Sequence, residues 1–424
     1  MKRVLIISPH FPPSNLAAVH RSRLFAQHLP SFGWEPIILT VHEKHYEEKH
    51  DWNLVKLLPE NLRIEKVDAY KLTNPRIIGD IGLRAFFQLY RRAKELVKKE
   101  KLDFVYIPIP SFYVALIGRM LHRSTGVKYG IDFIDPWVHP FPNSKTSLRH
   151  KLSETIAKVL EPIAVKNASV ITGVAEGYYK GVFDRNPHLN ETCIAGAMPY
   201  GGEKADHEKV AEIGLKPYLF QKNSNKIQLV YAGAMLPKAY EPLRMIFEAI
   251  RDNRALFNDL EIHFIGTGSR PTDPESYNIK PHAIEFGLWD EVVYEYPARI
   301  PYLDALVHLD AANGVFILGS TEPHYTPSKV YQGVLSGKPI LALLHKDSTA
   351  LKVLNNTNAG IGYAFDPNKL ELISEDFENL FQSYSKFVSK FDVADVNLAA
   401  FDAYSARSVT DMLATLFDKA IVKN

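Results

Sequence analysis

The chain has 424 residues, of which 46% are hydrophobic and 23% charged, a composition typical of a soluble globular protein and not of a disordered one. Its length favours two or three domains. The 50 Lys and Arg residues against 48 Asp and Glu leave a formal net charge of +2, which argues against a dedicated nucleic-acid-binding protein. The single cysteine, Cys193, excludes an internal disulfide and a cysteine-based zinc site and favours the cytoplasm.

No stretch of the sequence approaches the ~20 apolar residues that a membrane-spanning helix requires. The N-terminal apolar run at residues 4–7 is also shorter than the ~7–15 residues of a signal-peptide core, so we interpret it as a buried strand. Any membrane contact is therefore expected to be peripheral.

Short apolar runs alternate with longer amphipathic stretches along the first half of the chain. Strands are predicted at residues 4–7, 36–39, 104–107, 127–131 and 170–172. Helices are predicted at residues 20–29, 83–99, 113–122 and 148–165. This alternation is typical of a parallel sheet with helices on both faces.

The alternation is interrupted at residues 198–225, which are rich in Gly, Lys, Asn and Pro and read as a linker into a second domain. A second series of strands is predicted at residues 227–231, 261–265, 292–294, 314–317, 339–343 and 360–363. Helices are predicted at residues 243–251, 302–308, 328–336 and 350–355, and a terminal helix from about 397 to 423.

The predicted fold class is α/β, with two doubly wound, Rossmann-like halves that face each other across a cleft. Residues 1–197 form the first predicted domain and residues 198–396 the second. The terminal segment, residues 397–424, is expected to pack back toward the first domain. Because doubly wound folds bind ligands beyond the carboxyl ends of their strands, the loops at those ends are the candidate sites.

The loop after the first predicted strand reads Ser-Pro-His-Phe-Pro-Pro and ends with Pro12 and Pro13. It precedes a helix that carries Arg21 and Arg23, and a helix N-terminus favours anions. These four residues are candidates for a ligand site. A rigid proline turn followed by ordinary surface arginines is the alternative interpretation.

The segment 131–137, Ile-Asp-Phe-Ile-Asp-Pro-Trp, follows another predicted strand. The proline holds Asp135 in an extended conformation, where its carboxylate could orient a sugar hydroxyl or act as a base, with Asp132 nearby. The alternative is a turn-forming Asp-Pro pair with Trp137 in the core.

Two loops of the second half carry candidate phosphate ligands. After the first strand there, Gly233 allows close approach of backbone amides to a ligand, and Lys238 offers a point charge for a phosphate. The alternative is an exposed lysine on an ordinary loop. At residues 326–329, Thr-Pro-Ser-Lys opens a short predicted helix, where hydroxyls, backbone amides and a cation make a seat for a diphosphate. Gln332, one turn later, can hydrogen-bond vicinal hydroxyls.

Two other patterns are weaker. The glycine-rich segment 266–269 is a lone Gly-x-Gly after a strand. His42, His45 and His50 lie among glutamates, but they lack a three-ligand spacing, so we favour a solvated loop and predict no metal site.

The segment 83–101 is basic and amphipathic, with seven Lys and Arg residues, two glutamates and interleaved aromatic and aliphatic side chains. Such a helix can lie on an anionic membrane surface, which makes it a candidate peripheral membrane contact. An outer helix of the sheet with a solvated basic face is the alternative.

In their order, spacing and placement after strands, these motifs resemble those of a family 4 glycosyltransferase of the GT-B type, over nearly the whole chain. The resemblance is greatest to a bacterial branch that opens with Phe-Pro-Pro and ends its first sheet with Asp-Phe-Arg-Asp-Pro-Trp. In this chain the second motif reads Asp-Phe-Ile-Asp-Pro-Trp at residues 132–137.

The resemblance implies an enzyme that transfers a sugar from a nucleotide-activated donor with retention at the anomeric carbon. Such enzymes usually need no metal, so no cofactor beyond the donor substrate is implied. The donor lies mainly on the C-terminal half and the acceptor mainly on the N-terminal half. A pair of cations neutralises the departing diphosphate, and the leaving phosphate is often assigned the role of base.

Carried over residue by residue, the resemblance makes Lys238 the phosphate lysine and gives Lys329 the second charge. The positions of the family's two glutamates are His324 and Gln332, the second of which binds the ribose. Ala234 replaces the family's arginine after the strand glycine. Ile134 likewise replaces the arginine of the Asp-Pro-Trp motif.

The complete predicted site has three parts. The catalytic residues are Asp135, Lys238 and Lys329; the donor side comprises Gly233, Ala234, His324, Tyr325, Thr326, Ser328 and Gln332; the acceptor side comprises Pro12, Pro13, Arg21, Arg23 and Asp132.

The first hypothesis is a retaining glycosyltransferase of cell-surface polysaccharide or glycolipid synthesis, with a glycan or lipid-linked glycan acceptor. It would be cytoplasmic, at the inner face of the membrane, with no nucleic-acid partner. A catalytically silent GT-B homologue that binds a partner enzyme or glycan is the alternative, supported by the three lost charges. A sugar-nucleotide epimerase ranks last, because no set of acidic and basic groups around a sugar is evident.

Overall fold

The computed structural model describes residues 1–76, 78–138, 148–322 and 325–423, and the chain forms two units. The first unit is Met1–Tyr200 together with Ala406–Asn424, and the second is Gly201–Ser405. The first division thus falls three residues after the predicted boundary at 197/198. The chain re-enters the first unit at residue 406, nine residues after the start of the predicted terminal segment. None of the helices in the described ranges is long and apolar enough to cross a membrane.

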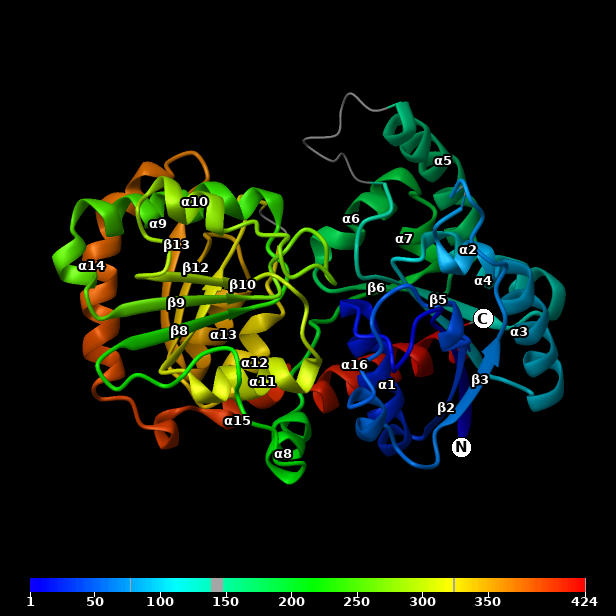
Figure 1. Cartoon of the computed structure of the whole chain (residues 1–424). Helices are drawn as coiled ribbons and strands as arrows, with labels where there is room; N and C mark the ends of the chain where they lie inside the picture. Colours follow the sequence, from blue (N-terminus) through cyan, green and yellow to red (C-terminus); the bar gives the residue numbers. More distant parts are fainter. Residues whose placement is uncertain (77, 139–147, 323–324, 424) are drawn as a thin grey trace. The chain divides into compact units, whose positions relative to one another are not determined.

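The first unit is built on a seven-stranded parallel sheet with the order β3-β2-β1-β4-β5-β6-β7 (Figure 1). Its strands are β1 (Lys2–Ile7), β2 (Trp34–Val41), β3 (Arg63–Val67), β4 (Phe104–Ile109), β5 (Lys128–Phe133), β6 (Val170–Gly173) and β7 (Ile194–Ala197). Every neighbouring pair is parallel, as the strand–helix alternation predicts.

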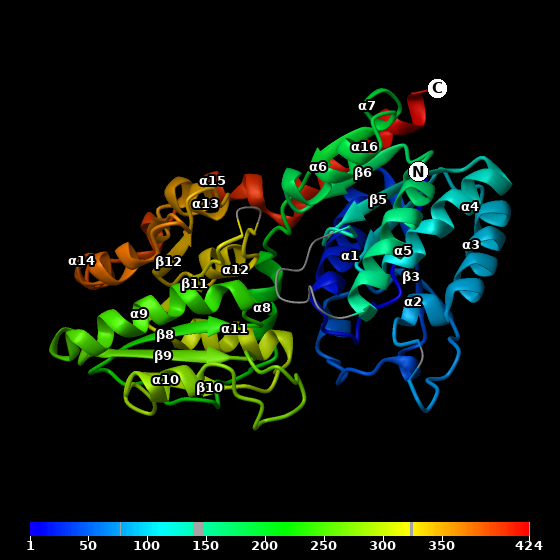
Figure 2. The same cartoon turned by 90° about the horizontal axis from the view of Figure 1, so that it is seen from above.

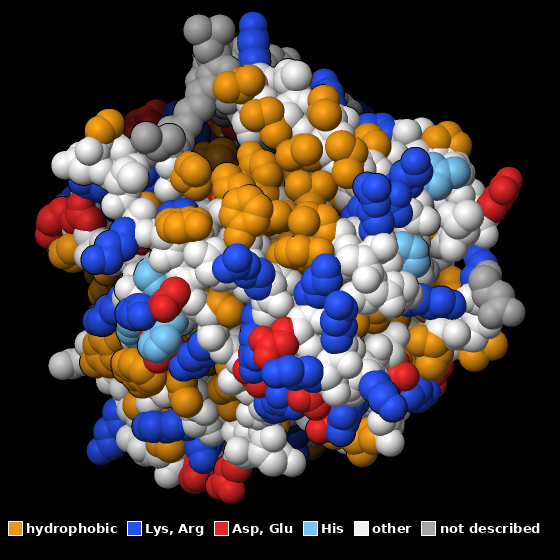
Figure 3. Space-filling model, turned by 90° about the vertical axis from the view of Figure 1, so that its right-hand side faces the viewer, with side chains coloured by type: hydrophobic (Ala, Val, Ile, Leu, Met, Phe, Trp, Pro, Cys, Tyr) orange, Lys and Arg blue, Asp and Glu red, His pale blue; other side chains and the backbone are white. Residues whose placement is uncertain are grey.

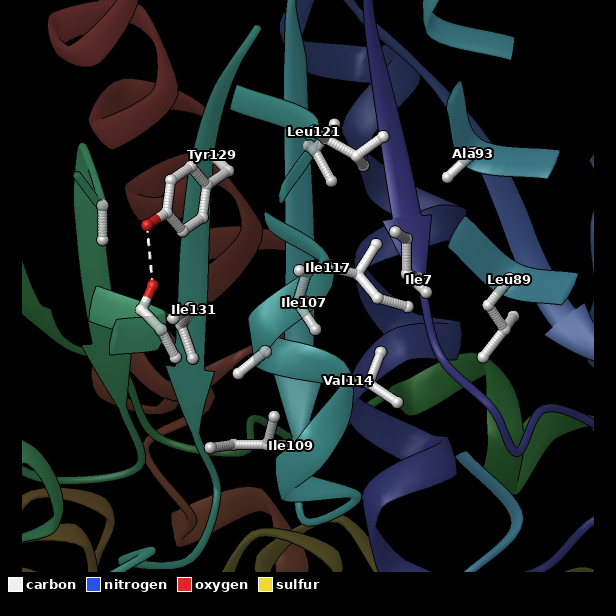
Figure 4. Close-up of a cluster of buried hydrophobic side chains, with 14 of the residues drawn as sticks. Ile7, Leu89, Ala93, Ile107, Ile109, Val114, Ile117, Leu121, Tyr129 and Ile131 are labelled. Atoms are coloured by element: carbon white, nitrogen blue, oxygen red, sulfur yellow. Dashed lines mark hydrogen bonds between the residues drawn. The ribbon is translucent and has the colours of Figure 1, made fainter. Parts of the chain in front are cut away.

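Helices cover both faces of this sheet. They are α1 (Ala17–His28), α2 (Ile81–Arg84), α3 (Phe86–Glu100), α4 (Ala115–Thr125), α5 (Leu148–Val165), α6 (Glu176–Arg185), α7 (Leu189–Thr192) and α16 (Ala406–Val422). On one face, α3 and α4 bury Leu89, Ala93 and Ile117 against Ile7 and Ile107 (Figure 4).

The opposite face of the first sheet is covered by α1 and α16. Phe417 of α16 lies against Trp34 and Phe104, with ring centroids 5.2 and 4.6 Å apart. Val409 and Leu413 of the same helix are buried in that cluster. The last helix of the chain is therefore part of the core of the first unit.

The second unit contains a six-stranded parallel sheet with the order β10-β9-β8-β11-β12-β13. Its strands are β8 (Ile227–Ala232), β9 (Leu260–Ile265), β10 (Val293–Tyr296), β11 (Gly314–Leu318), β12 (Ile340–His345) and β13 (Gly360–Phe365). Its helices are α8 (Lys204–Glu212), α9 (Tyr240–Asp252), α10 (Lys280–Glu285), α11 (Tyr302–Ala311), α12 (Lys329–Leu335), α13 (Ala350–Thr357), α14 (Glu371–Val388) and α15 (Leu398–Phe401).

Three sequence predictions need correction. The segment predicted as an irregular linker, 198–225, contains helix α8. The predicted terminal helix is two helices, because α15 ends at Phe401 in the second unit and α16 begins at Ala406 in the first. The basic segment 83–99 is divided at Ala85 into α2 and α3.

The apolar side of the amphipathic helix α3 faces the core of the first unit. Its apolar residues Leu89, Ala93, Leu96 and Val97 are buried in the core of the first unit. This is the packing of an outer helix of the sheet, so that apolar stripe is not available to a membrane.

Candidate functional site

Two glycines end neighbouring strands at the carboxyl edge of the second sheet. Gly233 follows β8 with φ +106°, and Gly266 follows β9 with φ +72°, both in the left-handed region that favours glycine. A Cβ atom on Gly266 would lie 3.8 Å from the Gly233 Cα atom. Gly233 and Ala234 are exposed, so their backbone groups are accessible to a ligand.

Lys329, at the start of α12, reaches back to this glycine pair. Its Nζ atom donates a hydrogen bond to the Ala234 carbonyl at 3.2 Å and lies 4.6 Å from the ring centroid of Tyr231. A Cβ on Gly233 would come within 3.3 Å of the Lys329 Cε atom. The segments that follow β8 and β11 therefore meet at this edge of the sheet.

The ammonium of Lys329 forms no ion pair with a carboxylate in the described part of the chain. Its half-buried position among protein atoms lowers its pKa to about 8. A cation held beside exposed backbone without an acidic partner is suited to bind an anion.

Lys238 lies in the segment after β8 and, unlike Lys329, has a carboxylate partner. Its Nζ atom is 3.7 Å from Glu322 Oε1, and its carbonyl accepts a hydrogen bond from Thr321 N at 3.2 Å. The Lys238 side chain is 36% exposed. A phosphate at this point would compete with Glu322 for the lysine, a partner that the sequence did not single out.

The other residues of the Thr-Pro-Ser-Lys segment differ in accessibility. Thr326 is buried, and its hydroxyl lies 2.8 Å from that of Thr349. Burial raises the pKa of Tyr325 to about 12. Ser328 is exposed, and its hydroxyl makes no capping hydrogen bond to α12. His324, a predicted donor-side residue, lies outside the described residues.

Gln332, in the ribose position of the resemblance, is held by a residue that sequence reasoning missed. His207 of α8 donates from Nε2 to Gln332 Oε1 at 2.9 Å, and its Nδ1 lies 3.6 Å from Asp310 Oδ1. His207 lies in the segment 198–225 that the sequence predicts to be a linker, and no motif there signals this contact.

In the first unit, Arg21 and Asp132 form a fully buried ion pair. Arg21 Nε and Nη2 lie 2.5 and 3.0 Å from the two carboxylate oxygens, and Nη1 donates to the Pro199 carbonyl at 2.8 Å. Thr172 donates to the same carboxylate at 2.8 Å. Burial by itself lowers the pKa of Arg21, but the charge and hydrogen bonds of Asp132 outweigh this and raise it.

Neither predicted arginine is a surface residue, because Arg21 and Arg23 are both buried. The guanidinium of Arg21 and the carboxylate of Asp132 bind each other inside the first unit. The pair anchors α1 to the carboxyl end of β5 rather than presenting charges to solvent. Pro12 and Pro13 are buried too, and the Pro13 carbonyl accepts from Asp51 N at 2.7 Å.

A pocket of about 260 Å³ lies at the carboxyl ends of β1, β4 and β5. Its lining is Ser8, Pro9, His10, Leu16, Ala17, Ala18, Pro108, Pro110, Ser111, Ile134, Asp135 and Tyr200. Asp135 is exposed at this pocket, whereas Trp137 is buried and stacks on Phe112 with centroids 5.7 Å apart. Trp137 thus lies in the core, as the alternative interpretation of that loop expects.

His10 is fixed in the pocket wall by a carboxylate behind it. Its Nδ1 lies 2.9 Å from Glu48 Oε1, and the Ser14 hydroxyl donates to the same oxygen. Burial by itself raises the pKa of Glu48, but the hydrogen bonds and charge of His10 outweigh this and lower the pKa to about 2. A histidine held in this way keeps a fixed ring orientation toward a ligand.

The histidines noted among glutamates make separate contacts. His45 lies 3.1 Å from Asp68, and His50 lies 3.2 Å from the Glu43 carbonyl. Within the described ranges, no group of three or more His, Cys, Asp or Glu side chains is placed to hold a metal ion.

Neither a protein-family profile nor a curated protein sequence matches the chain. Several solved structures are similar to the chain. A glycosyltransferase from Rickettsia africae ESF-5 is 16% identical, with a TM-score of 0.63 over 100% of this chain and 99% of that one. Anabaena HepE, solved in complex with UDP and glucose, is 12% identical, with a TM-score of 0.61 over 99% and 100%.

Sucrose-phosphate synthase from Thermosynechococcus elongatus is 13% identical, with a TM-score of 0.64 over 100% of both chains. At these identities the similarity concerns the fold. With its two parallel sheets of seven and six strands and their interleaved helices, the chain has the α/β fold of the GT-B glycosyltransferases.

Proposed function

We propose that the protein is a retaining glycosyltransferase that moves a sugar from a nucleotide-sugar donor to a glycan or lipid-linked glycan acceptor. The observation that supports this proposal is the position of Lys329 beside the exposed backbone of Gly233 and Ala234, where no described carboxylate pairs with its ammonium. Solved structures of the same fold support it, since Anabaena HepE was crystallised with UDP-glucose.

In this proposal the second unit binds the donor. Lys329 and Lys238 contact the diphosphate, the exposed backbone at Gly233 and Ala234 and the hydroxyl of Ser328 contribute hydrogen bonds, and Gln332 binds the ribose. When the bond from the anomeric carbon to the phosphate oxygen breaks, the electron pair stays on the departing diphosphate. The two lysines stabilise that developing charge, and no metal is invoked.

The pocket of the first unit is the proposed acceptor site. Its walls are mostly apolar, and in this proposal Asp135 and His10, among its polar lining residues, orient the acceptor hydroxyl. The new bond forms between the acceptor oxygen and the anomeric carbon on the face that the diphosphate leaves. The hydroxyl proton passes to the leaving phosphate oxygen. We assign the enzyme to the cytoplasmic side of a membrane, in polysaccharide or glycolipid synthesis.

The test is thermal stabilisation of the purified protein by nucleoside diphosphates and nucleotide sugars, measured without added metal. A ligand at ~100 times its dissociation constant adds ~2.7 kcal/mol to the free energy of unfolding. We expect one nucleotide class to produce this shift in the wild type and in Lys352→Met, a control at an exposed lysine of α13. We expect Lys329→Met to lose it.

No shift with any nucleotide at millimolar concentration would overturn the donor assignment. The chain would then be a catalytically silent homologue that acts as a binding subunit, consistent with the pairing of Lys238 to Glu322 and the loss of charge at Ala234 and Gln332. If a nucleotide binds, turnover with candidate acceptors decides between an enzyme and a nucleotide-binding partner.

A further inference from the structure

Helix α5 exposes an apolar stripe. Leu152, Val159 and Ile163 are 61%, 59% and 49% exposed, and half-buried Ile156 lies between them. The spacings of 4, 3 and 4 residues place all four on one side of a helix. The residues that α5 buries in the core, Ala157, Ala164 and Val165, lie on a different side.

The stripe is continued by the neighbouring helices. Helix α4 packs against α5, and α3 packs against α4. On α4 and the turn before it, Tyr113, Leu116 and Met120 are half-buried at a spacing of 3 and 4 residues. Near the start of α3, Phe87 is 63% exposed. Figure 3 shows the resulting apolar area on this side of the first unit, with lysines and arginines beside it.

Positively charged side chains outnumber negatively charged ones on these three helices. Among the described side chains, the exposed or half-buried cations are Arg91, Arg92, Lys94, Lys98 and Lys99 of α3, Arg119 and Arg123 of α4, and Lys151, Lys158 and Lys166 on or directly after α5. On a helical projection of α5, Lys151, Lys158 and Lys166 flank one side of the apolar stripe.

The acidic residues of the same helices are paired within the protein. Helix α4 contains none. Glu95 is bonded to Arg92 and Lys99, Glu100 to Arg63, and Glu154 to Lys158. Glu161 is buried against Arg185. The outer surface of these helices therefore combines exposed apolar side chains with an excess of positive charge.

We propose that this face, which we call the α3–α5 face, binds the surface of an anionic lipid bilayer. The three aliphatic side chains of α5 and the ring of Phe87 would enter the interface, while the flanking lysines and arginines contact lipid phosphates. A soluble monomer rarely exposes a contiguous apolar area of this kind without a partner. An anionic partner complements the cations, whereas a second copy of this face would bring like charges together.

The experiment is co-sedimentation of the full chain with phosphatidylcholine vesicles that contain either no anionic lipid or 30% phosphatidylglycerol. We expect binding to the anionic vesicles only, weakened at high salt. The variant L152S/V159S/I163S should bind on the order of tenfold less tightly. The matched control I284S/V393S/L398S changes side chains of similar exposure in the second unit and should bind like the wild type.

A second pair of variants tests the charges. K151Q/K158Q/K166Q should lose about fivefold in affinity for each lysine. The control K204Q/K352Q/K390Q removes the same charge from exposed positions of the second unit and should not weaken binding. All substitutions lie outside the proposed donor and acceptor sites. Unchanged nucleotide stabilisation and unchanged turnover of a soluble acceptor would show that the variants are folded, whatever the vesicle result.

Several results would overturn the proposal. They are no binding to anionic vesicles at low salt, equal binding to neutral vesicles, or equal loss in the two control variants. A dimer in analytical ultracentrifugation that dissociates on L152S/V159S/I163S would assign the face to a second copy instead. None of these results bears on whether the second unit binds a nucleotide sugar.

Discussion

The side-chain oxygen of Gln332 accepts a hydrogen bond from His207 at 2.9 Å, and this joins α8 to α12. This bond uses one of the two lone pairs of that oxygen, and the Gln332 amide nitrogen can donate a hydrogen bond to a ligand. A carboxylate at the same position would instead offer a second acceptor oxygen. At this position the chain can therefore present a hydrogen-bond donor, which a glutamate could not do.

We expect His207→Ala to weaken nucleoside-diphosphate binding about fivefold, because Gln332 would lose its orientation at a cost of ~1 kcal/mol. Isothermal titration calorimetry measures this. Gln332→Glu should restore an acceptor oxygen and bind at least as tightly as the wild type. His188→Ala, at an exposed histidine of the first unit, is the control. An unchanged dissociation constant in His207→Ala would contradict a positioning role.

The pH dependence of nucleotide binding should follow Lys329. Its pKa of about 8 in the free protein lies below the ordinary value, and an anion binds only the protonated form. Affinity should therefore be constant below pH 8 and fall as the pH rises above it. In Lys329→Arg the guanidinium stays charged, so the fall should be absent. Dissociation constants measured from pH 6.5 to 9.5 for the wild type and for Lys329→Arg test both expectations. Identical pH profiles for the two proteins would show that Lys329 does not cause the pH dependence.

The Arg21–Asp132 pair should matter for stability more than any exposed charge. Asp132→Asn leaves Arg21 buried without its counter-ion, and we expect the free energy of unfolding to fall by about 3–5 kcal/mol. The double variant Arg21→Met/Asp132→Leu should cost less, since both charges are removed together. Urea unfolding at pH 7 measures the difference, with exposed Asp184→Asn as control. Equal effects of Asp132→Asn and Asp184→Asn would contradict the assignment.

Glu48 should stabilise the first unit in a pH-dependent way. Its folded pKa of about 2 lies below the ordinary 4.5, so its contribution is complete above pH 4.5 and is lost as the pH falls toward 2. We expect Glu48→Gln to lower the free energy of unfolding by about 1–3 kcal/mol at neutral pH. The difference should shrink in acid. Glu47→Gln, at a more exposed carboxylate paired with Arg76, should show little change at either pH.

Most of the strands that sequence reasoning found are buried on both faces and read as uninterrupted apolar runs, the exceptions being the edge strands β10 and β13. Edge strand β3, with the sequence RIEKV, was missed because its charged residues face solvent. Strand β7, with the sequence IAGA, is too short and too weakly apolar to stand out. Helix α14 could have been found, since Ile373, Phe377, Phe381 and Tyr384 follow a helical period.

The approach of Lys329 to Ala234 followed from topology, because the segments after neighbouring parallel strands meet at one edge of the sheet. The pairing of Arg21 with Asp132 could not be predicted from topology. The two residues are 111 positions apart, and each has many candidate partners. The role of His207 was missed for the same reason. Sequence reasoning located the loops, whereas the partner of each side chain required the three-dimensional structure.

Helix α16 has a consequence for how the chain folds during its synthesis. The first unit needs Phe417 to cover Trp34 and Phe104, yet 205 residues of the second unit are made between Tyr200 and Ala406. The ribosome therefore completes the second unit, which is continuous in sequence, before the first can close its core. Until then, one face of the first sheet lacks its last helix. Nascent chains of this protein should depend most on chaperones during that interval, and removal of the last 19 residues should yield a soluble second unit attached to an unstable first one.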